Sequence, residues 1–74
     1  EVDPETVILG EVDLAGRVRS VPNIERLVKE AERLGFKRCL LPLANKEKAQ
    51  EASGIKIIGV ENIEGALAYI RDRG

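Results

Sequence analysis

Residues 9–42 read LGEVDLAGRVRSVPNIERLVKEAERLGFKRCLLP, and this stretch decides the fold. A β-rich segment, Thr6–Asp13, overlaps its start and is followed by a turn at Leu14–Gly16 and a second alternating segment, Arg17–Val21. Two such segments joined by a short glycine-containing turn predict a β-hairpin. Gly10 lies inside the first segment, where a glycine often marks a bulge or bend. We therefore expect the first strand to bend at Gly10.

The second half of the stretch predicts an amphipathic helix. Pro22 and Asn23 precede it, and we expect the Asn23 side chain to cap its first turn. Gly35 is the expected C-terminal stop. Apolar residues recur at the spacing that places them on one helical face; they are Ile24, Leu27, Val28, Ala31 and Leu34. We interpret this helix as lying on a sheet, in preference to a membrane or a partner's groove.

The remaining residues predict two further units of strand and helix. Phe36–Pro42 contains a consecutive apolar run typical of a strand covered on both faces. A short, charged helix over residues 46–52, capped by Asn45, should be mostly exposed. A strand over residues 55–60 and a last helix capped by Asn62 complete the chain; the apolar face of that helix would consist of Ile63, Ala66, Leu67 and Ile70.

The predicted fold class is thus α/β: a β-hairpin followed by α-β-α-β-α. The two later strands, separated by a helix, are expected to pair in parallel, with the long and final helices packed on the sheet. With 74 residues the chain is at most one domain, residues 1–74, of which residues 1–5 are expected to be a flexible lead-in.

Charge is uneven along the chain although its net charge is only −1. Residues 1–16 carry five acidic residues and no basic ones, whereas residues 17–38 carry seven basic and three acidic residues. Such a basic segment is either an ordinary solvated surface, the more common case, or an electrostatic face. The small net charge argues against a general nucleic-acid-binding or membrane-binding tail.

Residues suited to catalysis are scarce. The sequence has no histidine, and its one cysteine, Cys39, sits among apolar residues and is interpreted as a structural thiol. Glu11 and Asp13 share one face of the first segment, but a solvated strand face explains them better than a catalytic carboxylate pair. No phosphate-binding glycine motif is present. We expect no catalytic residue and no metal site.

No apolar run reaches the length of a membrane span, and no signal peptide is visible, so the expected location is the cytoplasm. The first residue is Glu1, which is consistent with a piece of a larger protein. If neighbouring strands are missing, exposed sheet edges would invite pairing with another chain. We therefore expect self-association and no membrane partner.

Three runs of residues carry a family resemblance: GEVDLAGRVRSV at 10–21, NIERLVKEAERLGFKR at 23–38 and IIGV at 57–60. Together they resemble the Lon-like carboxy-terminal domain of the RadA/Sms family of bacterial DNA-repair ATPases, over roughly residues 7–70. The fold implied is that of the Lon proteolytic domain, a ribosomal protein-type α/β sandwich, of which this chain would be a partial domain. Asp13 stands where this family usually has glycine.

The resemblance implies a non-catalytic scaffold and DNA-contact module of an ATP-dependent DNA repair and recombination protein that acts in branch migration. DNA would be bound through the parent ring, and the residues implied as DNA contacts are Arg17, Arg19, Lys37 and Arg38. In such proteins ATP, magnesium and zinc belong to upstream domains, so no cofactor is expected in this chain.

Three alternatives remain open: a fragment of the proteolytic domain of a Lon-type ATP-dependent serine protease, the tail of a ComM-like ATPase, and an independent small α/β domain. In Lon-type proteases a lysine near the start of the long helix completes a Ser-Lys dyad. Glu25 occupies that lost dyad-lysine position here. A carboxylate cannot serve as the amine of such a dyad, which makes peptidase activity the weaker alternative.

Overall fold

A computed structural model describes residues 4–73, which form five strands, three α-helices and one short 3-10 helix. In chain order the elements are β1 (Thr6–Ile8), β2 (Glu11–Val12), β3 (Val18–Arg19), α1 (Ile24–Arg33), β4 (Arg38–Pro42), η1 (Leu43–Asn45), α2 (Lys46–Ala52), β5 (Lys56–Val60) and α3 (Ile63–Arg73). The predicted α/β class and the order of its helices are confirmed.

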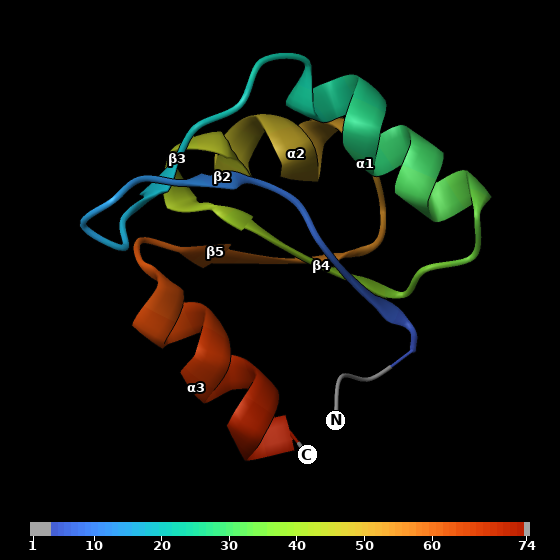
Figure 1. Cartoon of the computed structure of the whole chain (residues 1–74). Coiled ribbons are helices and arrows are strands. Elements are labelled where there is room, and N and C mark those ends of the chain that lie inside the picture. Colours follow the sequence, from blue (N-terminus) through green and yellow to red (C-terminus); the bar gives the residue numbers. More distant parts are fainter. Residues whose placement is uncertain (1–3, 74) are drawn as a thin grey trace.

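The central sheet contains three parallel strands in the order β1-β4-β5. Its register aligns Ile8 with Leu40 and Leu40 with Ile58. Helix α1 connects β1 to β4, and α2 connects β4 to β5, as parallel pairing requires. The predicted parallel pairing of the two later strands is confirmed, and a third strand joins them (Figure 1).

The predicted hairpin is smaller than expected. Only β2 and β3 pair in antiparallel fashion, through Glu11–Arg19 and Val12–Val18. The prediction that Thr6–Asp13 forms one hairpin strand was wrong, because its first part, β1, pairs instead with β4 in the central sheet.

The cause of this division lies in two residues. The Leu9 N–H donates to the Leu40 carbonyl at 2.8 Å, and the next bond of a parallel ladder would need an N–H from residue 42. Pro42 has none. The chain leaves the sheet at Gly10, with φ 144°, where an added Cβ would lie 3.3 Å from the Pro42 ring. The predicted bend at Gly10 is therefore real, and it separates two strands. Residues 10–21, which leave the sheet here, are called the arm below.

Helix α1 ends as predicted but begins differently. The Gly35 N–H donates to the Glu32 carbonyl and the Phe36 N–H to the Ala31 carbonyl, at 3.0 and 3.1 Å, with Gly35 at φ 96°. This pair of bonds is a Schellman stop. Asn23 does not cap with its side chain; it takes a left-handed conformation, φ 60°, which asparagine tolerates better than most residues. The predicted Asn23 cap was wrong.

The other two asparagines also differ from one another. Asn62 caps α3 as predicted, its Oδ1 accepting from the Gly65 N–H at 2.8 Å. Asn45 makes no side-chain cap. Its buried amide instead accepts from the Val21 N–H at 2.9 Å and donates to the Val21 carbonyl at 3.1 Å. Asn45 thereby replaces a strand partner for Val21 and fastens the arm to the sheet.

The two faces of the sheet are covered unequally. Helices α1 and α2 lie together on one face, and α3 lies on the other (Figure 1). The main core lies under α1 and α2 and consists of Ile24, Val28, Cys39, Leu41, Ala49 and Ile57. Helix α2 is mostly exposed as predicted, but Ala49 is fully buried in this core.

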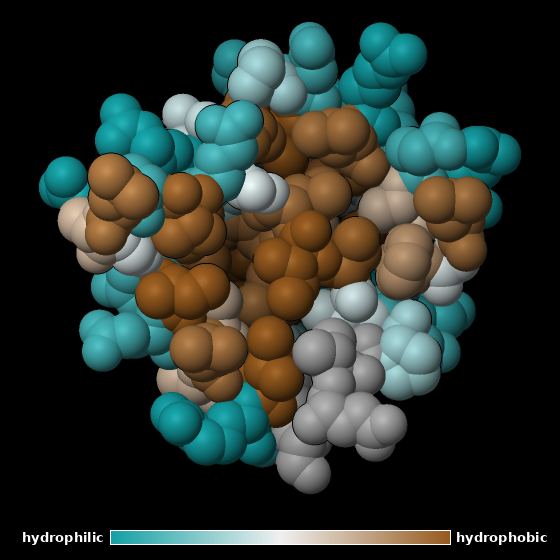
Figure 2. Space-filling model, in the orientation of Figure 1, coloured by the Kyte–Doolittle hydropathy of each residue, from teal (hydrophilic) through white to brown (hydrophobic). Residues whose placement is uncertain are grey.

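The face under α3 is more open. Leu40 is fully buried there, but Ile8 beside it is 51% exposed, and Leu67 of α3 is 53% exposed. Figure 2 shows apolar atoms gathered over the middle of the side of the molecule that Figure 1 presents, where β1 lies in front. The final helix packs on the sheet as predicted, but half of its apolar face is uncovered.

The predicted lead-in, residues 1–5, lies partly outside the described residues. The described part is not loose at Glu5. Its carbonyl accepts from the N–H groups of Lys37 and Arg38 at 2.8 and 3.1 Å. This segment is therefore fixed to the start of β4.

Candidate nucleic-acid interface

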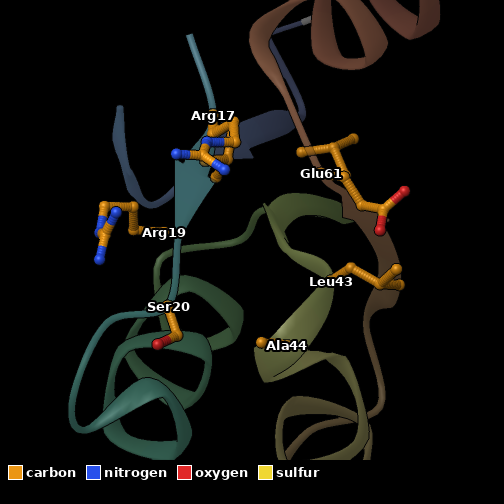
Figure 3. A pocket seen from close by; sticks show the side chains of 8 residues that line it. Arg17, Arg19, Ser20, Leu43, Ala44 and Glu61 are labelled. Atoms are coloured by element: carbon orange, nitrogen blue, oxygen red, sulfur yellow. The ribbon is translucent and has the colours of Figure 1, made fainter. Parts of the chain in front are cut away.

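An open groove of about 730 Å³ lies at the carboxyl end of the parallel sheet. Its walls come from β3, from η1 and from the end of β5 (Figure 3); the lining residues are Arg17, Val18, Arg19, Ser20, Leu43, Ala44, Val60 and Glu61. Ligands of parallel α/β sheets commonly bind at this end of the strands. Two of the four predicted DNA contacts, Arg17 and Arg19, line the groove.

The arm forms one wall because backbone hydrogen bonds tie it to β5 and α3. The Val18 N–H donates to the Glu61 carbonyl at 3.0 Å, and the Ile63 N–H donates to the Gly16 carbonyl at 2.8 Å. On the opposite wall, Gly59 allows η1 to cross β5 closely, since an added Cβ would lie 2.7 Å from Leu43 Cδ1. These contacts hold the two walls at a fixed separation.

The arginines converge on one carboxylate. Asp13 Oδ2 lies 3.5 Å from Arg17 Nε and 3.3 Å from Arg19 Nη1. The side chains of Arg17 and Arg19 are 73% and 64% exposed, whereas that of Asp13 is 21% exposed. Figure 3 places both arginines on the arm and Glu61 on the facing wall. The groove therefore has a cationic rim on one side and an acidic residue on the other.

Asp13 also organises the turn beneath the arginines. Its Oδ1 accepts from the N–H groups of Ala15 and Arg17 at 2.9 and 3.0 Å. The bond from the Arg17 N–H, with further contributions from Ala15 and the two guanidinium groups, lowers the pKa of Asp13. The carboxylate is therefore ionised at neutral pH and carries one negative charge beside two positive ones.

The other two predicted DNA contacts lie elsewhere. Arg38 begins β4 and approaches Glu5, with 3.7 Å between Arg38 Nη1 and Glu5 Oε1. Lys37 precedes it and is exposed. The groove adjoins the other end of β4, roughly 13 Å away for four residues of extended chain. The structure therefore does not bring the four predicted residues together into one patch.

The residues that the sequence raised for a catalytic role do not form a common site. Glu25 lies in the first turn of α1 and is exposed. Cys39 is fully buried in the core, and burial raises its pKa to about 11. Such a thiol is neutral and inert at physiological pH. Glu11 is exposed on β2, while Asp13 is turned into the hairpin, so they do not act as a carboxylate pair.

Residues 4–73 contain neither a cluster of metal ligands nor a helix suited to a membrane. Within residues 4–73, no three histidine, cysteine, aspartate or glutamate side chains are grouped so as to hold a metal ion. No helix in the same range is both long and apolar enough to span a membrane.

Sequence reasoning missed the role of Asp13 and the facing wall of the groove. An aspartate three residues before a glycine is a common signal for a turn, in which its side chain accepts nearby backbone N–H groups. That signal was present at Asp13-Leu14-Ala15-Gly16. Nothing in the sequence indicated that Leu43 and Glu61 would face the arm.

The fold and the groove define a small α/β module with two arginines, Arg17 and Arg19, at the rim of an open groove. No family model matches the chain. It is 48% identical over 65 residues to DNA repair protein RadA of Bacillus subtilis, 42% over 67 residues to that of Synechocystis and 38% over 68 residues to that of Escherichia coli. These matches cover 88%, 90% and 92% of this chain.

The chain spans only 14%, 13% and 15% of the length of these three relatives. Over that length it belongs to the RadA family, as a homologue of a carboxy-terminal part of RadA. The family resemblance seen in the sequence is thereby confirmed.

Proposed function

We propose that this chain is a non-catalytic DNA-contact and assembly module of a RadA-type DNA repair protein. One observation carries the proposal: Arg17 and Arg19 stand together at the rim of an open groove in a homologue of proteins named for DNA repair. We propose a Lon-like fold for the domain that contains it. For the whole protein we propose ATP-dependent recombination by branch migration.

The chemistry of the groove fits a nucleic-acid backbone. Guanidinium groups bind phosphate oxygens by charge-assisted hydrogen bonds, and such contacts hold DNA without reading its sequence. Leu43 and Ala44 give the groove an uncharged part against which sugars can pack. Glu61 on the facing wall would repel a second phosphate, which favours one strand running along the arm.

A peptidase function has less support. The position at which a Lon-type protease needs a lysine holds Glu25, an exposed carboxylate at the start of α1. The relatives reported above are RadA proteins. A supporting and positioning role is therefore the better proposal.

The DNA contact is tested by charge reversal in the full-length protein. Arg17→Glu with Arg19→Glu should weaken binding of a labelled oligonucleotide about tenfold or more, and should reduce the salt dependence of binding by about two ions. A matched control, Lys48→Glu with Arg71→Glu, makes the same charge change at exposed positions outside the groove lining. Fluorescence anisotropy over a range of salt concentrations measures both quantities.

Equal effects of the two double variants would refute a specific role for the groove. Lys37→Glu is tested separately, because Lys37 lies at the other end of β4. If Lys37→Glu weakened DNA binding and the Arg17, Arg19 double variant did not, the DNA contact would lie at the Lys37 end of the sheet instead of at the groove.

We further propose that the module self-associates through the open face under α3. Ile8 lies on β1, an outer strand of the central sheet, and Leu67 lies on α3. Outer strands pair readily with a second chain, and a two-fold axis would place the same apolar residues opposite each other. The proposed partner is thus a second copy of this chain.

Ile8→Lys tests the self-association. After circular dichroism has shown that the chain is folded, sedimentation should detect a concentration-dependent dimer that Ile8→Lys abolishes. Leu14→Lys, at the fully exposed tip of the hairpin, is the control and should leave the dimer intact. A monomer at every concentration would contradict this proposal.

A further inference from the structure

We infer that Asp13 is a positioning residue that holds Arg17 and Arg19 as a pair and competes with DNA phosphate for them. This inference rests on the proposed DNA contact and adds a device that regulates it. It concerns a residue that does not itself line the groove but contacts two residues that do.

The geometry gives the two carboxylate oxygens separate tasks. Oδ1 accepts only backbone N–H groups, from Ala15 at 2.9 Å and Arg17 at 3.0 Å, and so fixes the turn. Oδ2 faces the guanidinium groups of Arg17 and Arg19 at 3.5 and 3.3 Å. The turn bonds need only an acceptor atom, whereas holding two cations needs the negative charge. A substitution can therefore remove the second task and keep the first.

The location of Asp13 makes it a competitor of DNA. Both arginine side chains are largely exposed, so their ion pairs with Asp13 are weak and exchange readily with solvent or another anion. A phosphodiester also presents one negative charge to guanidinium groups. Without a ligand, Asp13 brings the two cations together on one side of the arm. With DNA bound, phosphate would replace it, and part of the binding affinity would be lost to that exchange.

A charge-matched control lies on the same hairpin. Glu11 of β2 is exposed, and its replacement by glutamine removes one negative charge two residues from Asp13. The Glu11 side chain takes no part in the turn bonds from Ala15 and Arg17. Glu11 stands opposite Arg19 in the β2–β3 register, so Glu11→Gln removes a negative charge close to the same arginine without removing the turn acceptor. It is a strict reference against which the specific effect of Asp13 is measured.

The experiment measures oligonucleotide binding by the full-length protein, using anisotropy at several salt concentrations. Asp13→Asn keeps an Oδ1 acceptor and loses the charge. We expect it to raise the affinity at low salt about fivefold above Glu11→Gln, and to steepen the salt dependence by about one ion. In an Arg17→Gln, Arg19→Gln background the same substitution should have no more effect than Glu11→Gln. Asp13→Ser, whose hydroxyl can also accept in a turn, should reproduce the result if Asp13→Asn folds poorly.

The outcomes separate the inference from the function on which it rests. If Arg17→Gln with Arg19→Gln leaves binding unchanged, both the proposed DNA contact and the role of Asp13 are overturned. If that double variant weakens binding but Asp13→Asn and Asp13→Ser behave like Glu11→Gln, or bind more weakly, only the role of Asp13 is overturned. A gain that depends on the two arginines supports it.

Discussion

The two faces of the central sheet differ in how completely they are covered. Under α1 and α2, the side chains of Val28, Cys39, Leu41 and Ala49 are inaccessible to solvent. Under α3, Ile8 and Leu67 are each about half exposed. Both faces derive from the same strands, whose residues alternate between them. The closed face thus supplies most of the stability of this small domain. The open face leaves apolar side chains accessible to solvent.

The largest expected difference between the faces is in unfolding free energy. Leu41→Ala should lower it by about 2–5 kcal/mol, because a fully buried leucine leaves a cavity. Leu67→Ala on the open face should lower it by less than about 1 kcal/mol, because little buried surface is lost. Urea denaturation followed by circular dichroism measures both. Similar losses would mean that α3 packs on the sheet as tightly as α1 does.

Thiol reactivity gives a second measure of the same contrast. Burial raises the pKa of Cys39 to about 11, so the thiolate fraction of the folded protein at pH 8 is about 100-fold below that of an ordinary thiol. Alkylation of the folded chain by iodoacetamide should be slower than in denaturant by at least that factor. Leu67→Cys in a Cys39→Ala background should react nearly as fast as the unfolded chain. Rapid alkylation of Cys39 would show that the closed face opens readily.

The pKa of Cys39 also fixes the sign of a pH effect. Because the folded state holds the proton more tightly, this group contributes stability below the ordinary thiol pKa, and the contribution is lost as the pH rises through about 11.

Two glycines give the smallest expected effects, with opposite signs. Gly59→Ala should destabilise the fold by about 1–3 kcal/mol, because its Cβ would lie 2.7 Å from Leu43 Cδ1 and 3.1 Å from Leu43 Cα. A Cβ added at Gly65 in α3 would lie 3.4 Å from Asn62 Oδ1, which is an ordinary contact distance. Gly65→Ala should therefore stabilise the fold by up to about 1 kcal/mol, because alanine has the higher helix propensity. Thermal unfolding measures both. A tolerated alanine at 59 would contradict the close crossing of η1 over β5.

Sequence reasoning succeeded where a pattern is local. The Gly35 stop of α1 and the Asn62 cap each depend on residues a few positions apart, and both were predicted. The predicted apolar stripe of α1 holds in part: Ile24, Val28 and Ala31 are buried. Leu27 and Leu34, which were assigned to the same stripe, are exposed.

Sequence reasoning failed where a distant residue decides. Asparagine is a residue type that often caps helices, and Asn45 directly precedes α2. Its side-chain amide instead hydrogen-bonds the backbone N–H and carbonyl of Val21, which lies 24 positions away. Similarly, the end of β1 is set by Pro42, which no window around β1 contains.

The candidate site follows the same rule. Arg17 and Arg19, like the other two candidate contacts, were chosen from the basic segment 17–38 under the family resemblance. The structure places them side by side on the arm, where both form ion pairs with Asp13. Lys37 and Arg38 were grouped with them by charge alone, and the parallel strand places them at its opposite end. Charge clustering along a chain indicates a shared surface only when the residues belong to one element or neighbouring ends of elements.

The departure of the chain from the sheet at Gly10 has a dynamic consequence. Beyond that point the arm is attached by the paired bonds of Val21 to Asn45 and by the backbone bonds of Val18 and Ile63. Breaking these few bonds would release one wall of the groove without disturbing a single bond of the parallel ladder. The amides of the arm should therefore exchange with deuterated water through local opening, far faster than those of β4. The arm is thus the part of the groove that opens most easily, while the parallel sheet beneath it stays intact.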